Sequence, residues 1–103
     1  MTRIIACGEI DIGTAGHLYR AVLDVLRRQR PVRMELDLAR VTFLDASGVR
    51  ALLMSRDAAA EVGCHLTVVE PSRIAHRVLD IVGLLETLGL APVPPPSPPA
   101  GDR

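Results

Sequence analysis

Two hydrophobic periods alternate along this 103-residue chain, and their alternation predicts an α/β fold. Within residues 32–38, apolar residues occupy every second position with charged residues between them, which is typical of a strand with one solvated face. Within residues 18–26, apolar residues recur every three or four positions, which is typical of an amphipathic helix lying on a sheet. Strands that alternate with helices imply a mostly parallel sheet with right-handed crossovers.

Turn residues divide the chain into the expected elements. We expect strands at 4–7, 32–38 and 66–69, and the first of them ends at Gly8. Helices are expected from the turn at 11–14 to Pro31, from the junction at 45–48 to Gly63, and from residue 74 to Gly83, with a short last helix at 84–88. The inner stripe of the third helix is expected to consist of Ile74, Val78, Ile81 and Val82.

A run of prolines after Leu90 marks a boundary in the chain. These residues belong neither in a helix nor in an inner strand: Pro92, Pro94, Pro95, Pro96, Pro98 and Pro99. We therefore expect one folded domain at residues 1–90 and a proline-rich disordered tail at residues 91–103.

Charge and aromatic content argue against direct nucleic-acid binding. The formal net charge is zero, and Tyr19 and Phe43 are the only residues of the Phe, Trp and Tyr types. The chain therefore lacks both the basic excess that neutralises phosphates and the rings that stack on bases. The apolar run at residues 1–7 is far shorter than a signal-peptide core or a membrane span, so we expect a cytoplasmic protein without membrane insertion.

The sequence contains no recognisable catalytic or metal-binding pattern. His17, His65 and His76 fall on different expected elements, and neither a phosphate-binding glycine loop nor a nucleophile elbow occurs. Cys7 and Cys64 lack the paired spacing of zinc ligands or redox motifs, so each is expected to be a small buried apolar residue. We expect no catalytic residue, no metal and no cofactor. A small enzyme that uses one of the two thiols is the alternative from another functional class.

The junction at residues 45–48, Asp-Ala-Ser-Gly, allows two interpretations. The first backbone N–H groups of a helix lack partners within the helix, so Asp45 or Ser47 caps the helix, and Gly48 leaves the surface open to close approach. On composition and spacing alone, capping is the simpler interpretation. In the functional interpretation, the Ser47 hydroxyl is presented to a kinase, and its phosphoryl group lies at the positive end of the helix.

Five segments, in this order, resemble STAS domains of the anti-sigma factor antagonist type. They are Gly-Glu-Ile-Asp at 8–11, the alternating strand into Leu-Asp-Leu at 36–38, the stretch at 41–49, Val-Val-Glu-Pro-Ser at 68–72, and the stretch at 77–84. The resemblance covers nearly all of the chain except the proline-rich tail. It implies an α/β fold, with a single STAS domain built on a mostly parallel mixed β-sheet of about four strands flanked by helices.

The resemblance also implies a switching mechanism. In such proteins the hydroxyl residue before the glycine, here Ser47, is phosphorylated by an anti-sigma factor that is also a serine kinase, and a serine phosphatase reverses the reaction. Relatives often carry two adjacent hydroxyl residues, whereas Ala46 leaves Ser47 alone. By the same resemblance, Asp45 supports presentation of the hydroxyl, and Asp11 contributes to partner docking, although ordinary turn chemistry explains Asp11 equally well. The expected partner-binding residues are Asp11, Asp45, Ala46, Gly48 and Val49.

The expected function follows from this mechanism. The unmodified protein captures the anti-sigma factor and releases a sigma factor, whereas the phosphorylated protein does not bind, and ATP with its magnesium ion belongs to the partner. The alternative is a STAS module without phosphorylation that acts as a docking subunit of a lipid transporter or a stress-signalling complex.

Overall fold

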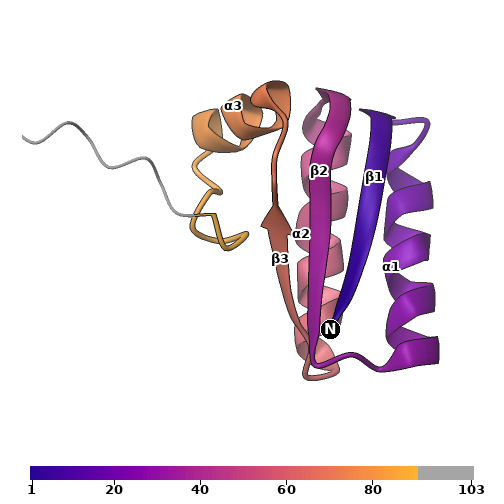
Figure 1. The fold of residues 1–103 in the computed structure, drawn as a ribbon. Coiled ribbons are helices and arrows are strands. Elements are labelled where there is room, and N and C mark those ends of the chain that lie inside the picture. The colour runs from indigo at the N-terminus through magenta and orange to yellow at the C-terminus, as the bar shows by residue number, and fades with distance from the viewer. Residues whose placement is uncertain (91–103) are drawn as a thin grey trace, which may run out of the picture.

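The computed structural model describes residues 1–90, and the expected tail at 91–103 lies outside the described residues. Strands and helices alternate along the chain, as the two hydrophobic periods predict (Figure 1). The elements are β1 (Thr2–Ile10), α1 (Ala15–Gln29), β2 (Arg33–Leu44), α2 (Ala46–Glu61), β3 (His65–Val69) and α3 (Arg73–Ile81).

The described residues form a three-stranded sheet in the order β1-β2-β3, and both neighbouring pairs are parallel. The expectation of about four strands in a mixed sheet is therefore corrected. The strand expected at 32–38 also runs on to Leu44, because β1 continues to pair with it as far as the partners Ile10 and Leu44. The predicted end of β1 at Gly8 is also wrong. Gly8 has φ 81°, and the left-handed conformation that glycine tolerates accommodates an irregularity beyond which pairing resumes.

In Figure 1, α2 lies behind the sheet and α1 stands beside β1 at the right, and both helices pack into the same core. Met34, Leu36 and Leu38 point from β2 into this core and are fully buried. Facing them are the apolar stripes of the two helices, formed by Leu18, Val22 and Leu26 of α1 and by Val49, Ala51, Leu52 and Ala59 of α2. The predicted amphipathic α1 and the alternating β2 are thus confirmed.

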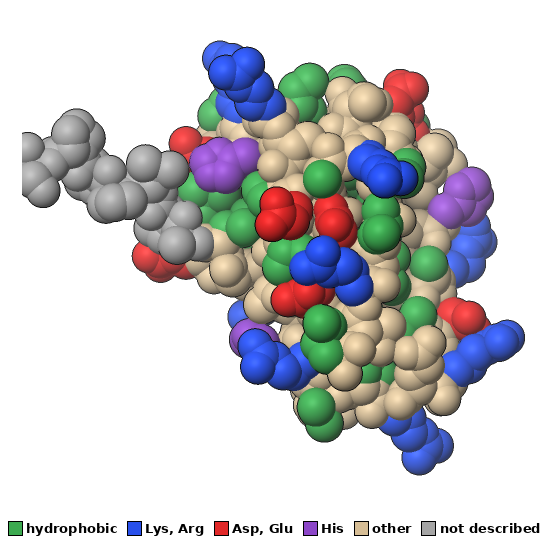
Figure 2. Space-filling view, viewed as in Figure 1, with side chains coloured by type: hydrophobic (Ala, Val, Ile, Leu, Met, Phe, Trp, Pro, Cys, Tyr) green, Lys and Arg blue, Asp and Glu red, His purple; other side chains and the backbone are tan. Residues whose placement is uncertain are grey.

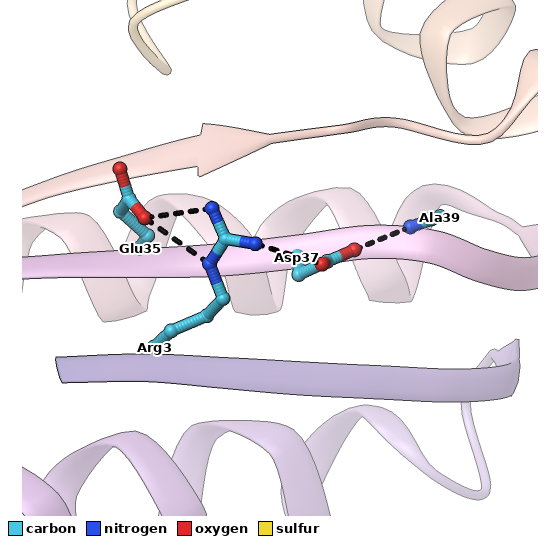
Figure 3. Close-up of polar contacts among 4 residues, drawn as sticks. All are labelled: Arg3, Glu35, Asp37 and Ala39. Carbon is cyan, nitrogen blue, oxygen red and sulfur yellow. Dashed lines mark hydrogen bonds and ion pairs between the residues drawn. The ribbon is translucent and has the colours of Figure 1, made fainter.

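The opposite face of the sheet carries charged side chains, which gather near its middle in Figure 2. Arg3 of β1 reaches across to β2 (Figure 3), where its Nη2 lies 3.0 Å from Glu35 Oε1 and its Nη1 lies 3.4 Å from Asp37 Oδ2. Asp37 Oδ1 also accepts a hydrogen bond from the Ala39 N–H at 2.9 Å. Such partly exposed ion pairs stabilise the fold by about 0–1 kcal/mol each. The main stabilisation therefore comes from the apolar layer on the other face of the sheet.

The third helix buries a different stripe from the predicted one. Ala75 and Leu79 are fully buried, whereas the exposed fractions of Ile74 and Ile81 are 46% and 74%. The anchoring of the helix start explains the difference. The Ser72 N–H donates to the Leu38 carbonyl at 2.9 Å, and Ser72 Oγ accepts from the Ala75 N–H at 3.2 Å, so the first turn is held with Ala75 against β2.

The predicted short helix at 84–88 is replaced by consecutive turns. The Leu88 N–H donates to the Leu84 carbonyl at 3.1 Å, but the Leu88 carbonyl accepts from Val68 of β3 at 2.8 Å. Because this bond ties the segment to the edge of the sheet, it does not continue as a helix. Leu85 and Leu88 are buried against the core there.

The two cysteines lie in different environments, which corrects the expectation that both are buried. Cys64 is buried, whereas Cys7 is exposed because it occupies the uncovered face of β1. Burial raises the pKa of the Cys64 thiol above its ordinary value and so reduces its thiolate fraction at neutral pH.

Iodoacetamide at pH 8 is therefore expected to alkylate Cys7 well before Cys64 in the folded protein. In a Cys7→Ser variant, labelling should be slow in buffer and become fast in denaturant, as followed by intact mass. Equal labelling rates for the two thiols of the native protein would contradict this assignment.

Candidate functional site

The candidate site lies at the carboxyl ends of β1 and β2, where α1 and α2 begin (top of Figure 1). Ile10 and Leu44 are register partners at these strand ends, so Asp11 and Asp45 begin the two neighbouring loops. The Asp45 N–H donates to the Ile10 carbonyl at 3.3 Å, which ties the loops together. Since paired strands lie about 4.8 Å apart, the parallel sheet brings these two aspartates side by side, although they are far apart in sequence.

Asp45 caps α2. Its backbone is extended, with φ −111° and ψ −172°, and its Oδ1 accepts a hydrogen bond from the Gly48 N–H at 3.0 Å. The sequence left open whether Asp45 or Ser47 takes this role, and the structure assigns it to Asp45. Within residues 1–90, the Ser47 hydroxyl makes no hydrogen bond, and Ser47 is partly exposed in the first turn of α2.

Gly48 is the point of closest contact between α2 and the sheet. A Cβ at this position would lie 2.5 Å from the Ile10 carbonyl oxygen, 2.5 Å from Leu44 Cδ1 and 3.0 Å from Ile10 Cγ2. Because Gly48 has no side chain, the start of α2 can lie close to the ends of β1 and β2. Val49 is also buried, so both residues face the core beneath the site.

Asp11 has a local structural role. Its Oδ1 accepts from the N–H groups of Gly13 at 2.9 Å and Thr14 at 3.1 Å, and its own N–H donates to Thr14 Oγ1 at 2.9 Å. The turn chemistry anticipated for Asp11 is thus present, and the carboxylate is partly exposed at the same end of the sheet as Ser47. Ala46, the first residue of α2 and the neighbour of Ser47, is exposed.

Ser47 lines a shallow hollow of about 170 Å³ between the first turns of α1 and α2. Among the residues that form it, Ser47 alone was predicted from the sequence as a functional residue. A spacing signal existed for Arg50, since residues three apart on a helix are neighbours on its surface. The lining residues are Ala15, Gly16 and Tyr19 of α1 and Ser47, Arg50, Ala51 and Met54 of α2.

Two further features of the described chain bear on its chemistry. Residues 1–90 contain no group of three or more His, Cys, Asp or Glu side chains placed to hold a metal ion. Among the helices of the same residues, none combines the length and the apolar character needed to cross a bilayer.

Solved structures similar to this one come from several kinds of protein. An anti-sigma factor antagonist from Mycobacterium paratuberculosis matches at a TM-score of 0.75 and 27% identity, covering 88% of this chain and 76% of its own. A sulfate transporter family protein from Wolinella succinogenes matches at a TM-score of 0.72 and 28% identity, covering 85% of this chain and 70% of its own. The unphosphorylated anti-sigma factor antagonist SpoIIAA matches at a TM-score of 0.72 over 89% of this chain and 81% of its own, and at 20% identity it supports the fold alone.

Sequence comparison assigns the family. No curated protein matches the chain. The family model described as "Mlab, STAS domain" matches residues 2–91, which include every element of the fold and the candidate site. The parallel sheet, the helices on one face and the similar solved structures agree with this match. The chain therefore belongs to the STAS domain family.

Proposed function

We propose that this protein is an anti-sigma factor antagonist that binds an anti-sigma factor/serine kinase in the cytoplasm, releases a sigma factor, and is switched off by phosphorylation of Ser47. The likeness to the Mycobacterium paratuberculosis antagonist supports the class of function. The observation that carries the proposal is the division of roles at the start of α2. Asp45 caps the helix, which leaves the Ser47 hydroxyl partly exposed and without a hydrogen bond in the described residues.

Phosphorylation at Ser47 leaves the fold intact. The modification adds about −1.5 to −2 charges, and a negative charge near a helix N-terminus is favourable by roughly 0.3–1 kcal/mol. A charge buried without a partner in a protein interface instead costs about 2–5 kcal/mol. Because the cost in the interface exceeds the effect on the helix, the phosphoryl group controls partner affinity and not folding.

The proposed partner surface surrounds Ser47. Asp11, Asp45 and Ala46 are accessible beside it, and their backbone positions are set by the loop contacts at the ends of β1 and β2. Gly48 and Val49 contribute indirectly, because their packing against the core determines where the first turn of α2 lies. A serine phosphatase that acts on the same exposed position completes the cycle.

Incubation with a serine kinase of the anti-sigma factor type from the same genome, with ATP and magnesium, is expected to modify Ser47. Peptide mapping by mass spectrometry locates the phosphoryl group, and Ser47→Ala should abolish it. Two other serines are internal controls. Ser55 is fully buried and donates to the Ala51 carbonyl at 2.7 Å, and Ser72 caps α3, so neither should be modified. Absence of phosphate on Ser47 with every such kinase would contradict the proposed switch.

A second candidate is a STAS docking subunit of a lipid transporter or a stress-signalling complex that is not phosphorylated. The name of the matching family model and the likeness to a sulfate transporter family protein favour it. An unmodified Ser47 together with stable co-purification of a transporter subunit would select this function over the first.

A further inference from the structure

We propose that Arg50, supported by Arg20, binds the phosphoryl group of phosphorylated Ser47 within the hollow between α1 and α2. The inference deepens the proposed function and depends on it for the natural occurrence of phosphoserine at this position. The two arginines would bind the phosphoryl group within the same chain.

Arg50 is placed to reach a phosphoryl group on Ser47. The two residues are three apart on α2, so their Cβ atoms lie roughly 5–6 Å apart on the same helix surface. Both line the hollow of about 170 Å³, and Arg50 is the charged residue among those that line it. The planar guanidinium matches phosphate oxygens with two parallel hydrogen bonds, a geometry that a single ammonium group does not provide.

Arg20 approaches the hollow from the opposite helix. Its Nη2 lies 3.9 Å from the position that a Cβ on Gly16 would occupy, and Gly16 forms part of the α1 wall. Because Gly16 has no side chain, no Cβ separates the Arg20 guanidinium from this part of the wall. Arg50 therefore lines the hollow itself, and Arg20 lies next to its α1 wall at Gly16.

Both arginines are available for an anion. Within the described residues, neither Arg20 nor Arg50 forms an ion pair, whereas Arg3, Arg28 and Arg56 each have an acidic partner. The two aspartates at this end of the sheet direct one oxygen to backbone N–H groups, Asp45 Oδ1 to Gly48 and Asp11 Oδ1 to Gly13 and Thr14, and neither pairs with an arginine within residues 1–90. An arriving phosphoryl group thus meets cations that no neighbouring carboxylate has neutralised.

This contact would change the chemistry of the modified site. Pairing with guanidinium groups favours the dianion of the phosphate, whereas Asp11 and Asp45 oppose it. Binding of the phosphoryl oxygens also withdraws Arg50 from the surface offered to a partner. The modified protein therefore differs from the unmodified one in two ways, through the added charge and through the captured arginines.

The test uses full-length protein with phosphoserine introduced at position 47 by genetic encoding, so no kinase is needed. Titration of the phosphate followed by 31P NMR reports its second pKa directly. The comparison is made in a His17→Gln background, which removes the imidazole exposed in the first turn of α1.

Arg50→Gln is expected to raise the phosphate pKa by roughly 0.3–0.7 units, the size expected for an exposed charge pair, and Arg20→Gln by less. Arg50→Lys should give an intermediate value, because it keeps the charge and loses the paired geometry. Arg56→Gln is the matched control on the same helix, since Arg56 Nη1 pairs with Asp57 Oδ1 at 3.5 Å, and it should leave the value unchanged.

The same phosphate pKa in the parent, Arg50→Gln and Arg20→Gln proteins would overturn the inference. This failure differs from failure of the proposed function. A kinase that leaves Ser47 unmodified would refute the switch without affecting the titration of the encoded phosphoserine, and equal pKa values would refute the role of the arginines without affecting the kinase result.

Discussion

Replacing Ser47 with aspartate is expected to weaken binding of the anti-sigma factor by about thirtyfold to several thousandfold. The added carboxylate brings a charge without a partner into the contact formed around the start of α2, and burying such a charge costs about 2–5 kcal/mol. The fold should tolerate the change, because Ser47 is partly exposed and an acidic side chain in the first turn of a helix is favourable. Isothermal titration calorimetry with the anti-sigma factor/kinase from the same genome measures the effect.

Ser47→Ala is the matched control. It removes a hydroxyl that makes no hydrogen bond within residues 1–90, so this variant should fold normally and bind the anti-sigma factor constitutively, even after incubation with kinase and ATP. Equal affinities of the alanine and aspartate variants would count decisively against a charge switch at this position.

The second large effect is expected from Gly48→Ala, which should lower the free energy of unfolding by about 1–3 kcal/mol. The new methyl group would stand 2.5 Å from the Ile10 carbonyl oxygen, a backbone atom that also accepts the Asp45 N–H. To relieve the clash, α2 must move away from β1. Helix propensity favours alanine over glycine by about 1 kcal/mol and so acts in the opposite direction, which makes a net loss diagnostic of the clash. Urea denaturation followed by circular dichroism measures it.

Gly16→Ala provides the comparison for this experiment. Gly16 also lies in the first turn of a helix, but a Cβ there would meet only Arg20 Nη2, at 3.9 Å. The substitution should leave stability unchanged or raise it by up to about 1 kcal/mol. If Gly48→Ala were as stable as Gly16→Ala, the packing of α2 on the end of β1 would have to be looser than the structure shows.

The local pattern of residues was sufficient to predict the order of the elements. The alternation at 32–38 and the apolar stripe of Leu18, Val22 and Leu26 each reflect the buried side of one element. Both elements are confirmed, although Val32 lies before β2 and is exposed. The junction at 45–48 was recognisable for a similar reason, because an aspartate, a serine and a glycine at the start of a helix have strong local preferences.

Predictions that depended on distant neighbours were less successful. For α3, the periodicity fitted a stripe through Ile74 and Ile81, but the anchoring of Ser72 to Leu38 turned Ala75 and Leu79 toward β2. Cys7 was expected in the core, yet none of the helices within residues 1–90 covers its side of β1. The segment at 84–88 has a helical pattern that the hydrogen bond from Val68 interrupts.

Local patterns in the chain were enough to predict the α/β class, the positions of α1 and α2, and the short stretch around Ser47 as a possible switch. Tertiary contacts were needed to show that Asp45 caps α2, that Gly48 packs against the ends of β1 and β2, and that Ser47 and Arg50 line a hollow next to α1. The physical reason is the range of the interactions. Periodicity and capping are set by residues within about a turn of one another, whereas a site between two helices depends on how the parallel sheet aligns segments that are more than thirty residues apart.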